Sequence, residues 1–357
     1  MPMASGDVKT YPALLPLSWL YSLVTRGRNQ LFDWGVLEER QFDVPVITVG
    51  NLTVGGTGKT PHVEHLVRLL RSETHVAVLS RGYRRQTKGF VMADAGSTAV
   101  TIGDEPLQMH RKFGDITVAV DADRRHGIEQ LLQQEPKPGV ILLDDAYQHR
   151  YVKASLSILL TDYHRLFSRD LVLPAGRLRE PRSGKRRADI VVVTKCPPTM
   201  SEAERQAIAS ELALETRQHL FFSCIDYAPL ESLTDGPALP LEALNQHHVL
   251  LLSGIANPTP LENTLKAHAS EVRMMQFADH HTFTASDMER VADAFGALAE
   301  PRLLVTTEKD AARLEGTGLL PHSLREHGYT LPIRIRFLFG QGETFDEEVR
   351  ERLNIKD

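Results

Sequence analysis

Short apolar runs alternate with segments of helical periodicity along most of this chain. The first run, at 44–49, is rich in β-branched residues. After a glycine-rich turn, Val63, Leu66, Val67 and Leu70 recur at helical spacing. Further strand-like runs lie at 75–79, 116–120, 140–143, 156–160 and 190–193. Strands that alternate with helices in this way are typical of an α/β domain with a mostly parallel sheet.

A second block of alternating elements follows a polar helix predicted at 201–218. Strand-like runs at 220–227 and 331–337 bracket it, and between them we predict strands at 248–252 and 302–306 and helices at 261–268 and 286–298. The simplest architecture is a smaller α/β domain inserted between two strands that act as a hinge. The predicted parts are an N-terminal region at 1–36, a core at 37–219, a two-stranded linker at 220–229 and 329–339, a smaller domain at 230–328 and a C-terminal helix at 340–357.

The N-terminal segment 11–24 is apolar but shorter than the roughly 20 residues that span a bilayer. No basic region precedes it and no clear cleavage site follows, so it is not predicted to be a signal peptide. One face of the expected helix carries four apolar side chains: Leu17, Leu20, Tyr21 and Val24. The pattern fits a helix lying in a membrane interface, and it fits equally a surface helix docked on the domain core.

A glycine-rich loop, TVGGTGKT at 53–60, lies between the first predicted strand and the first long helix. Backbone N–H groups of such a loop close around phosphates, and the helix N-terminus that follows favours negative charge. Lys59 is expected to reach the β- and γ-phosphates of a nucleotide, and the Thr60 hydroxyl to bind Mg²⁺. The loop departs from the usual P-loop pattern at its first position, where Thr53 replaces glycine. The residues expected to bind nucleotide are Thr53, Val54, Gly55, Gly56, Thr57, Gly58, Lys59 and Thr60.

A second part of the expected nucleotide site is an acidic pair, Asp144 and Asp145, at the end of an apolar strand. P-loop enzymes place an aspartate at this position to hold magnesium. By itself, a strand that ends in two aspartates is more often a turn or a helix cap. The P-loop at this separation makes a magnesium site the better interpretation.

Composition excludes several other classes of protein. The chain has 357 residues, a net charge of −5 and only two cysteines, neither in a metal-binding spacing. A structural zinc site, a disulfide framework and a general nucleic-acid coat are therefore not expected, and a reducing, cytoplasmic compartment fits best. The segment 177–187 holds six basic residues among eleven but no aromatic one, so a nucleic-acid-binding ATPase ranks last among the alternatives.

Two other P-loop classes fit poorly. A switch GTPase needs an Asn/Thr-Lys-x-Asp element for guanine, and the segment that begins at Thr194 and Lys195 lacks the aspartate. ParA-like ATPases carry a lysine just before the paired glycines, where this chain has Val54. An ATP-dependent nucleotide switch or metal chaperone, which hydrolyses nucleotide without a phosphate acceptor, remains an alternative function, although exposed metal ligands are not evident in the sequence.

Six motifs follow one another along the chain: NLTVGGTGKTP at 51–61, SRGY at 80–83, GDEP at 103–106, LDDAYQH at 143–149, LPAGRLREP at 173–181 and FADH at 277–280. Together they closely resemble the tetraacyldisaccharide 4'-kinase family of lipid A biosynthesis. The resemblance spans nearly the whole chain in order. It implies transfer of the ATP γ-phosphate, with Mg²⁺, to the 4'-hydroxyl of a tetraacylated glucosamine disaccharide 1-phosphate. It also implies two α/β subdomains joined by two strands, and peripheral attachment to the cytoplasmic face of the bacterial inner membrane. No obligate protein partner and no nucleic-acid partner are expected.

The resemblance further implies roles for single residues. Asp104 is expected to be the catalytic base and His280 its partner, with the adjacent His281 as the less favoured choice, and Glu105 joins the expected magnesium ligands. A base and partner from two domains would require a closure step that assembles the site and excludes water. Forked guanidinium groups near strand ends suit phosphate. The expected substrate-binding residues are Arg81, Tyr83, Arg124, Arg125, Gln148, Arg179 and Glu180.

Overall fold

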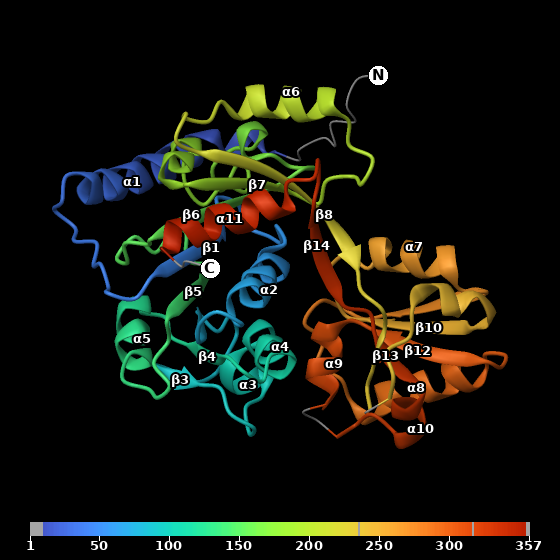
Figure 1. Ribbon diagram of the computed structural model, residues 1–357. Coiled ribbons are helices and arrows are strands. Elements are labelled where there is room, and N and C mark those ends of the chain that lie inside the picture. The colour runs from blue at the N-terminus through green and yellow to red at the C-terminus, as the bar shows by residue number, and fades with distance from the viewer. Residues whose placement is uncertain (1–9, 235, 316–317, 355–357) are drawn as a thin grey trace.

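The computed structural model describes residues 10–234, 236–315 and 318–354, and within them the chain forms two sheets. Residues 1–9 of the predicted N-terminal region, Asp235 and residues 316–317 of the predicted smaller domain, and residues 355–357 of the predicted C-terminal helix lie outside this description. Figure 1 shows the smaller sheet and its helices beside the larger part, with two long strands running between them. The α/β class expected from the sequence is confirmed.

The larger sheet has nine strands in the described part of the chain. In spatial order they are β14 (Ile333–Phe337), β8 (His219–Tyr227), β7 (Ile190–Thr194), β6 (Leu156–Asp162), β1 (Val46–Asn51), β5 (Val140–Asp144), β2 (Val76–Ser80), β4 (Thr117–Val120) and β3 (Val91–Met92). The pairings from β8 to β4 are parallel, and the edge strands β14 and β3 are antiparallel to their neighbours. Because parallel strands end at one edge of the sheet, the loops after β1, β5, β2 and β4 lie near one another, and ligands bind at such an edge.

Helices cover both faces of the larger sheet, as side-chain alternation along the strands requires. Ile47 and Val49 of β1 share a buried cluster with α2 (Lys59–Leu70), α4 (Asp104–Lys112) and α11 (Gly342–Leu353). Val46, on the opposite side of the same strand, packs with α5 (Arg124–Leu131). Beside α5, on the same face, α6 (Glu202–Leu212) covers β7 and β8. Two further helices, the long α1 (Leu15–Asp33) and the short α3 (Ala99–Ile102), belong to this part.

The smaller sheet has five strands among the described residues, in the order β11 (Glu271–Gln276), β10 (His248–Ser253), β12 (Arg302–Thr306), β13 (Gly328–Thr330) and β9 (Glu231–Ser232). One face packs on α7 (Thr259–His268), and the other on α8 (Ala285–Gly296), α9 (Glu308–Glu315) and α10 (His322–Glu326). Residues 328–330 pair with β12. For this reason the second of the two connecting strands begins at Ile333, two residues later than the pattern predicts.

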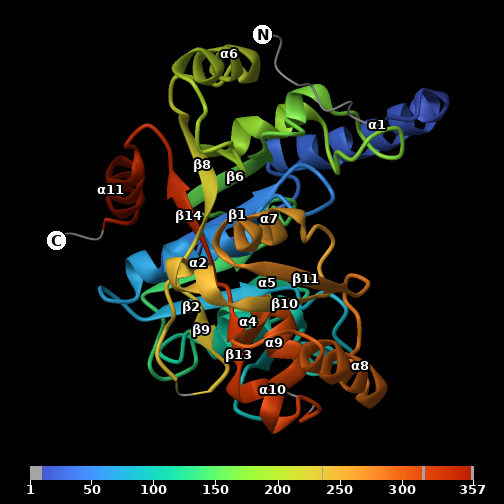
Figure 2. The same cartoon turned by 90° about the vertical axis from the view of Figure 1, so that its right-hand side faces the viewer.

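The two sheets are connected by β8 and β14, which pair antiparallel through 223–227 and 333–337. The first half of β8 also pairs with β7, so the connection is a continuation of the larger sheet (Figure 2). A second contact joins the two parts away from these strands, where α4 lies against α9. There Lys112 forms ion pairs with Glu64 of α2, at 2.6 Å, and with Glu308 of α9. The smaller part is therefore held at two places, by the strand pair and by α4.

Candidate active site

The glycine-rich loop lies between β1 and α2, at the edge where the parallel strands end. Gly55 and Gly58 adopt φ of +117° and +80°, which a residue with a Cβ rarely adopts. The fully buried Asn51 supports the loop from beneath, and its amide donates to Thr57 Oγ1 at 2.9 Å. The loop is thus shaped with its glycines where the backbone turns, as phosphate binding requires.

The backbone conformation at Thr53 explains why this position, which is glycine in the usual P-loop pattern, can be a threonine. Thr53 forms an antiparallel bridge with Leu178, and the N–H of Val54 donates to the Arg177 carbonyl at 2.8 Å. The first turn of the loop is therefore extended backbone that pairs with another segment, and no left-handed conformation is needed there. This pairing also connects the loop directly to the motif at 173–181, which supplies Arg179 and Glu180.

The acidic pair ends β5, the strand that pairs with β1. Lys59 Nζ lies 3.6 Å from Asp145 Oδ1, and Arg179 Nη1 lies 3.1 Å from the same oxygen. Asp145 therefore lies between two cations, Lys59 and Arg179. A nucleotide phosphate arriving at Lys59 would meet both a fixed ammonium and the first turn of α2, which contains Thr60.

Asp144 is buried, and its Oδ1 has no hydrogen-bond partner. Burial raises the pKa of Asp144 to about 7, and the neighbouring charges of Glu105 and Asp145 add to this effect. An unpartnered carboxylate oxygen among other acids is costly without a cation, so this group fits a divalent ion. Three or more His, Cys, Asp or Glu side chains do not converge into a complete metal cage anywhere in the described residues. A site with only a few protein oxygen ligands suits Mg²⁺, which keeps waters and phosphate oxygens as its other ligands.

Asp104 and His280 meet between the two parts of the molecule, with Nδ1 of His280 2.7 Å from Oδ2 of Asp104. Asp104 opens α4 directly after Gly103, whose φ is +94°; a Cβ there would come within 3.0 Å of the Tyr83 carbonyl oxygen. His280 itself has a φ of +61°, a strained value for a histidine. His281 turns away, and its Nε2 lies 2.9 Å from Asp287 Oδ2 at the start of α8. Of the two adjacent histidines, only His280 is in contact with Asp104.

Gln148 and Glu180 join a buried hydrogen-bond network that runs from the P-loop strand to the N-terminal helix. The Gln148 amide donates to the Asn51 carbonyl at 2.7 Å and to Glu180 Oε1 at 3.1 Å. Glu180 also accepts from Arg187 at 2.8 Å and from Asn29 of α1 at 3.1 Å. The sequence did not identify Asn29 or Arg187 as members of this network. They lie 151 and 7 positions from Glu180 in the chain, and no motif spacing links them to it.

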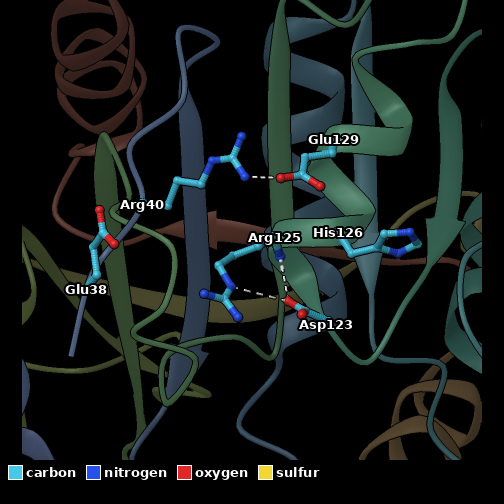
Figure 3. A pocket seen from close by; sticks show the side chains of 6 residues that line it. All are labelled: Glu38, Arg40, Asp123, Arg125, His126 and Glu129. Carbon is cyan, nitrogen blue, oxygen red and sulfur yellow. Dashed lines mark hydrogen bonds and ion pairs between the residues drawn. The ribbon is translucent and has the colours of Figure 1, made fainter.

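The predicted arginines do not all lie together. Arg124 is buried, its Nε has no hydrogen-bond partner, and its charge acts on Asp144 and Asp145. Arg125 instead lines a pocket with Glu38, Arg40, Asp123, His126 and Glu129, which includes none of the other predicted site residues (Figure 3). Arg81 follows β2, and the exposed ring of Tyr83 lies 6.1 Å from that of His280. The structure thus brings Arg124 and Tyr83, but not Arg125, toward the acidic residues and the histidine.

Two further residues near the P-loop were not expected from the sequence to contribute. The Lys195 ammonium, directly after β7, donates to the Gly56 carbonyl and lies 2.8 Å from Asp162 Oδ2. Thr194 Oγ1 donates to the Thr57 carbonyl at 2.9 Å. Thr194 and Lys195, which in the sequence resemble the start of a guanine-binding element, therefore support the middle of the P-loop through hydrogen bonds. Their sequence signal was visible, but their use as a support was not.

The N-terminal helix α1 presents its polar side to the protein and its apolar side outward. Ser18 and Ser22 are buried, Ser18 Oγ accepts from the Ala175 N–H at 2.8 Å, and Tyr21 OH donates to the Arg179 carbonyl at 3.0 Å. The opposite side carries large apolar side chains that are more than half exposed: Leu17, Trp19, Leu20, Leu23 and Val24. An ordinary surface helix buries its apolar stripe, and this helix does the reverse. Residues 10–234, 236–315 and 318–354 contain no helix of the length and hydrophobicity needed to span a bilayer.

A glycine loop between a parallel strand and a helix, a lysine facing an acidic pair, and a carboxylate–histidine pair beside them define a P-loop phosphotransferase. The model of the family described as Tetraacyldisaccharide-1-P 4'-kinase matches residues 10–354. The chain belongs to this family, and the resemblance seen in the sequence is confirmed.

Similar proteins of known name agree along the full length. The chain is 49% identical over 353 residues to the tetraacyldisaccharide 4'-kinase of Bacteroides thetaiotaomicron, covering 96% of this chain and 93% of that protein. It is 48% identical over 354 residues to the enzyme of the same name from Phocaeicola vulgatus, covering 98% and 97%. Its fold is similar to the crystal structure of LpxK from Aquifex aeolicus in complex with ATP, with a TM-score of 0.75, 30% identity, and coverage of 96% and 98%.

Proposed function

We propose that this kinase transfers the γ-phosphate of ATP to the 4'-hydroxyl of a tetraacylated glucosamine disaccharide 1-phosphate. The observation that carries the proposal is the Asp104–His280 contact of 2.7 Å, assembled from two parts of the molecule next to a P-loop. A nucleotide switch or metal chaperone needs no such carboxylate–histidine pair for an acceptor. Membership of a kinase family disfavours that alternative further.

Nucleotide binding rests on the loop and on the helix that follows it. Backbone N–H groups of 55–58 and the N-terminus of α2 would surround the phosphates, because the Val54 N–H is already bonded to Arg177, and Lys59 would neutralise the transferring group. Lys195 and Asn51 hold the loop in that shape from either side.

Magnesium would be held by Thr60 and Asp144, with Asp145 and Glu105 as the remaining acidic neighbours. The unpartnered Oδ1 of Asp144 is the donor atom that fits an ion best. When bound, the ion would neutralise charge on the phosphates. Binding would also favour the ionised form of Asp144, whose pKa burial raises.

Asp104 would act as the general base. As the 4'-oxygen forms its bond to the γ-phosphorus and the bond from that phosphorus to the β,γ-bridging oxygen breaks, the O–H proton passes to the Asp104 carboxylate. ADP leaves with the bridging oxygen. His280, bonded to Oδ2, orients the carboxylate and spreads its charge. Phosphoryl transfer depends mainly on positioning and electrostatics, so this orientation is expected to matter as much as basicity.

The acceptor would bind along the surface that runs from Tyr83 to Arg179. Arg81, Arg124 and Arg179 offer forked donors for phosphate groups, and Gln148 and Glu180 offer polar contacts for sugar hydroxyls. Arg125 stays a weaker candidate, because its guanidinium lies in the separate pocket with Asp123. No single arginine is assigned to the 1-phosphate.

The outward apolar face of α1 would dock in the membrane that holds this glycolipid, giving peripheral attachment at the cytoplasmic face of the bacterial inner membrane. Trp19 is 77% exposed and Leu20 59% exposed, on a helix at the edge of the molecule in both views (Figures 1 and 2). The polar side of the same helix bonds Arg179 and Glu180. A membrane-docked α1 would therefore place the acyl chains beside the residues proposed to bind the sugar.

Replacing two exposed leucines of α1, as Leu20→Ser with Leu23→Ser, is expected to weaken binding to phospholipid vesicles by about tenfold or more, because apolar area that enters the interface is lost. Vesicle co-sedimentation measures this. The matched control is Met92→Ser with Val100→Ser, which removes two exposed apolar side chains far from α1. Equal loss of vesicle binding in both double variants would contradict the assignment of α1.

The reaction itself is tested with Mg-ATP and tetraacyl disaccharide 1-phosphate in detergent micelles, with products followed by mass. We expect a product heavier by one phosphate, and none when EDTA removes the divalent ion. ATP hydrolysis with no phosphorylated lipid would contradict the proposal and favour the nucleotide switch.

A further inference from the structure

Arg313 of α9 joins Asp104 to the smaller part of the molecule. Its side chain is 7% exposed, and its Nη2 donates to Asp104 Oδ2 at 2.5 Å. Its Nη1 donates to Asp310 Oδ1 at 2.9 Å and to the Gly254 carbonyl at 3.2 Å. One guanidinium therefore bridges two carboxylates, one from each part of the chain. None of the six motifs in the sequence contains Arg313.

The Asp310 carboxylate, which bonds Arg313, is also held by hydrogen bonds within the smaller part of the molecule. Asp310 is completely buried, and its Oδ2 accepts from Thr307 Oγ1 at 2.7 Å and from the Gly254 N–H at 2.9 Å. A Cβ at Gly254 would come within 3.0 Å of Asp310 Oδ1, so the turn after β10 leaves little room for a side chain. Because a buried arginine needs a partner of opposite charge, Asp310 sets where the guanidinium can lie.

The bridge leaves one oxygen of Asp104 for the reaction. Arg313 and His280 both contact Oδ2, and among the described residues no hydrogen-bond donor reaches Oδ1. A carboxylate held at one oxygen by two groups cannot rotate freely, so Oδ1 keeps a fixed direction. That is the oxygen on which the proton of the acceptor hydroxyl would arrive.

The bridge also acts on the ionisation of Asp104. Partial burial opposes the charged form, but the hydrogen bonds from Arg313 and His280 and the charges of Arg313 and Lys309 outweigh it, and the pKa of Asp104 lies below its usual value. A lower pKa makes the carboxylate a weaker base but keeps it ionised at acidic pH. Phosphoryl transfer needs little help from a strong base, so the position of the Asp104 carboxylate is expected to matter more than its basicity.

We infer that Arg313 is a positioning residue that holds Asp104 through Oδ2 so that Oδ1 faces the acceptor hydroxyl. The inference rests on the proposed function, in which Asp104 is the base. Asp310 serves this role indirectly, because it fixes the guanidinium from behind. The smaller part of the molecule thus supplies two groups to the base, His280 and Arg313, from two different segments.

The test compares Arg313→Met and Arg313→Lys with Arg111→Met. Arg111 lies on α4 at the same contact between the two parts, bonded to the Ala312 carbonyl and to Glu315 at 3.2 Å, but it does not contact the base. Arg313→Met is expected to lower kcat about 10²-fold through misplacement of the carboxylate, with the KM for ATP within about twofold of wild type. Arg313→Lys keeps the positive charge, but its kcat should still fall, since one ammonium cannot bridge both carboxylates.

Several outcomes would overturn the inference. An Arg313→Met protein whose kcat falls no further than that of Arg111→Met, or whose KM for ATP rises in step with the loss of kcat, would show that Arg313 only joins the two parts. If Arg313→Met does not fold, an Arg313→Lys variant with full kcat would do the same. These results require an active wild-type enzyme; absence of lipid phosphorylation by the wild type would instead count against the proposed function.

Discussion

Replacing Asp104 by asparagine is expected to lower kcat about 10³-fold while leaving ATP binding nearly unchanged. Asparagine fills the same space and can still bond Arg313 or His280, but its amide cannot take the proton of the acceptor hydroxyl. Steady-state phosphorylation of the tetraacyl disaccharide 1-phosphate measures kcat, and titration with a fluorescent ATP analogue measures binding. The loss is expected in kcat because a base acts in the transition state and contributes little to ground-state binding.

His281→Asn is the matched control for this pair. His281 adjoins His280 but contacts Asp287, so its replacement should change kcat by less than about threefold, whereas His280→Asn should lower kcat by about 10–10². An Asp104→Asn enzyme with a kcat near wild type would remove Asp104 as the base. A larger loss in His281→Asn than in His280→Asn would reverse the choice between the two histidines.

Replacing Lys59 by methionine is expected to lower kcat by about 10²–10³. The Lys59 ammonium lies at the start of α2, 3.6 Å from Asp145, so its loss would remove the positive charge that we propose faces the transferring phosphoryl group. A methionine of similar length keeps the packing. The same lipid phosphorylation assay reports kcat, and thermal unfolding without ligand should change little.

Lys195→Met is the matched control. It removes a positive charge that contacts the P-loop from outside, whereas Lys59 is the lysine proposed to contact the phosphates. Lys195 bonds the Gly56 carbonyl, so its loss should raise the KM for ATP several-fold and affect kcat much less. Equal losses of kcat in the two variants would indicate that Lys59, like Lys195, only supports the loop.

Local pattern was sufficient for most of the architecture. The apolar runs at 140–143 and 190–193 became buried parallel strands with nearly the predicted bounds, because both faces of a central strand must be apolar. Elements with weaker patterns were missed. Strand β11 lies at an edge of the smaller sheet and is only half-buried, and the polar–apolar alternation of its sequence, EVRMMQ, breaks after four residues. The polar helix predicted to reach residue 218 ends at Leu212, followed by Ala213 in a left-handed conformation that no local signal marked.

The orientation of the N-terminal helix shows a different limit. Its apolar positions were visible in the sequence, and they fitted both a docked helix and a membrane helix. The tertiary structure decides which side meets the protein, because the partners of Ser18 and Tyr21 come from 175–179. Helical periodicity defines a face, but the identity of the surface opposite that face is a long-range property.

The sequence by itself determined the reaction class. A P-loop with Lys59 and Thr60, a strand ending in Asp144 and Asp145, and the ordered motifs are local features, since each reflects a loop or strand end whose geometry its own residues define. Only the tertiary structure decided which residues from distant segments meet. It brought His280 rather than His281 to Asp104, drew Arg125 into another pocket, and placed Arg313 and Asp310 behind the proposed base. The contacts of Asp104 with His280 and Arg313 join residues 176 and 209 positions apart in the chain, and they depend on how α4 and α9 pack. The choice of His280 over His281 depends on a single position, which no local pattern distinguishes.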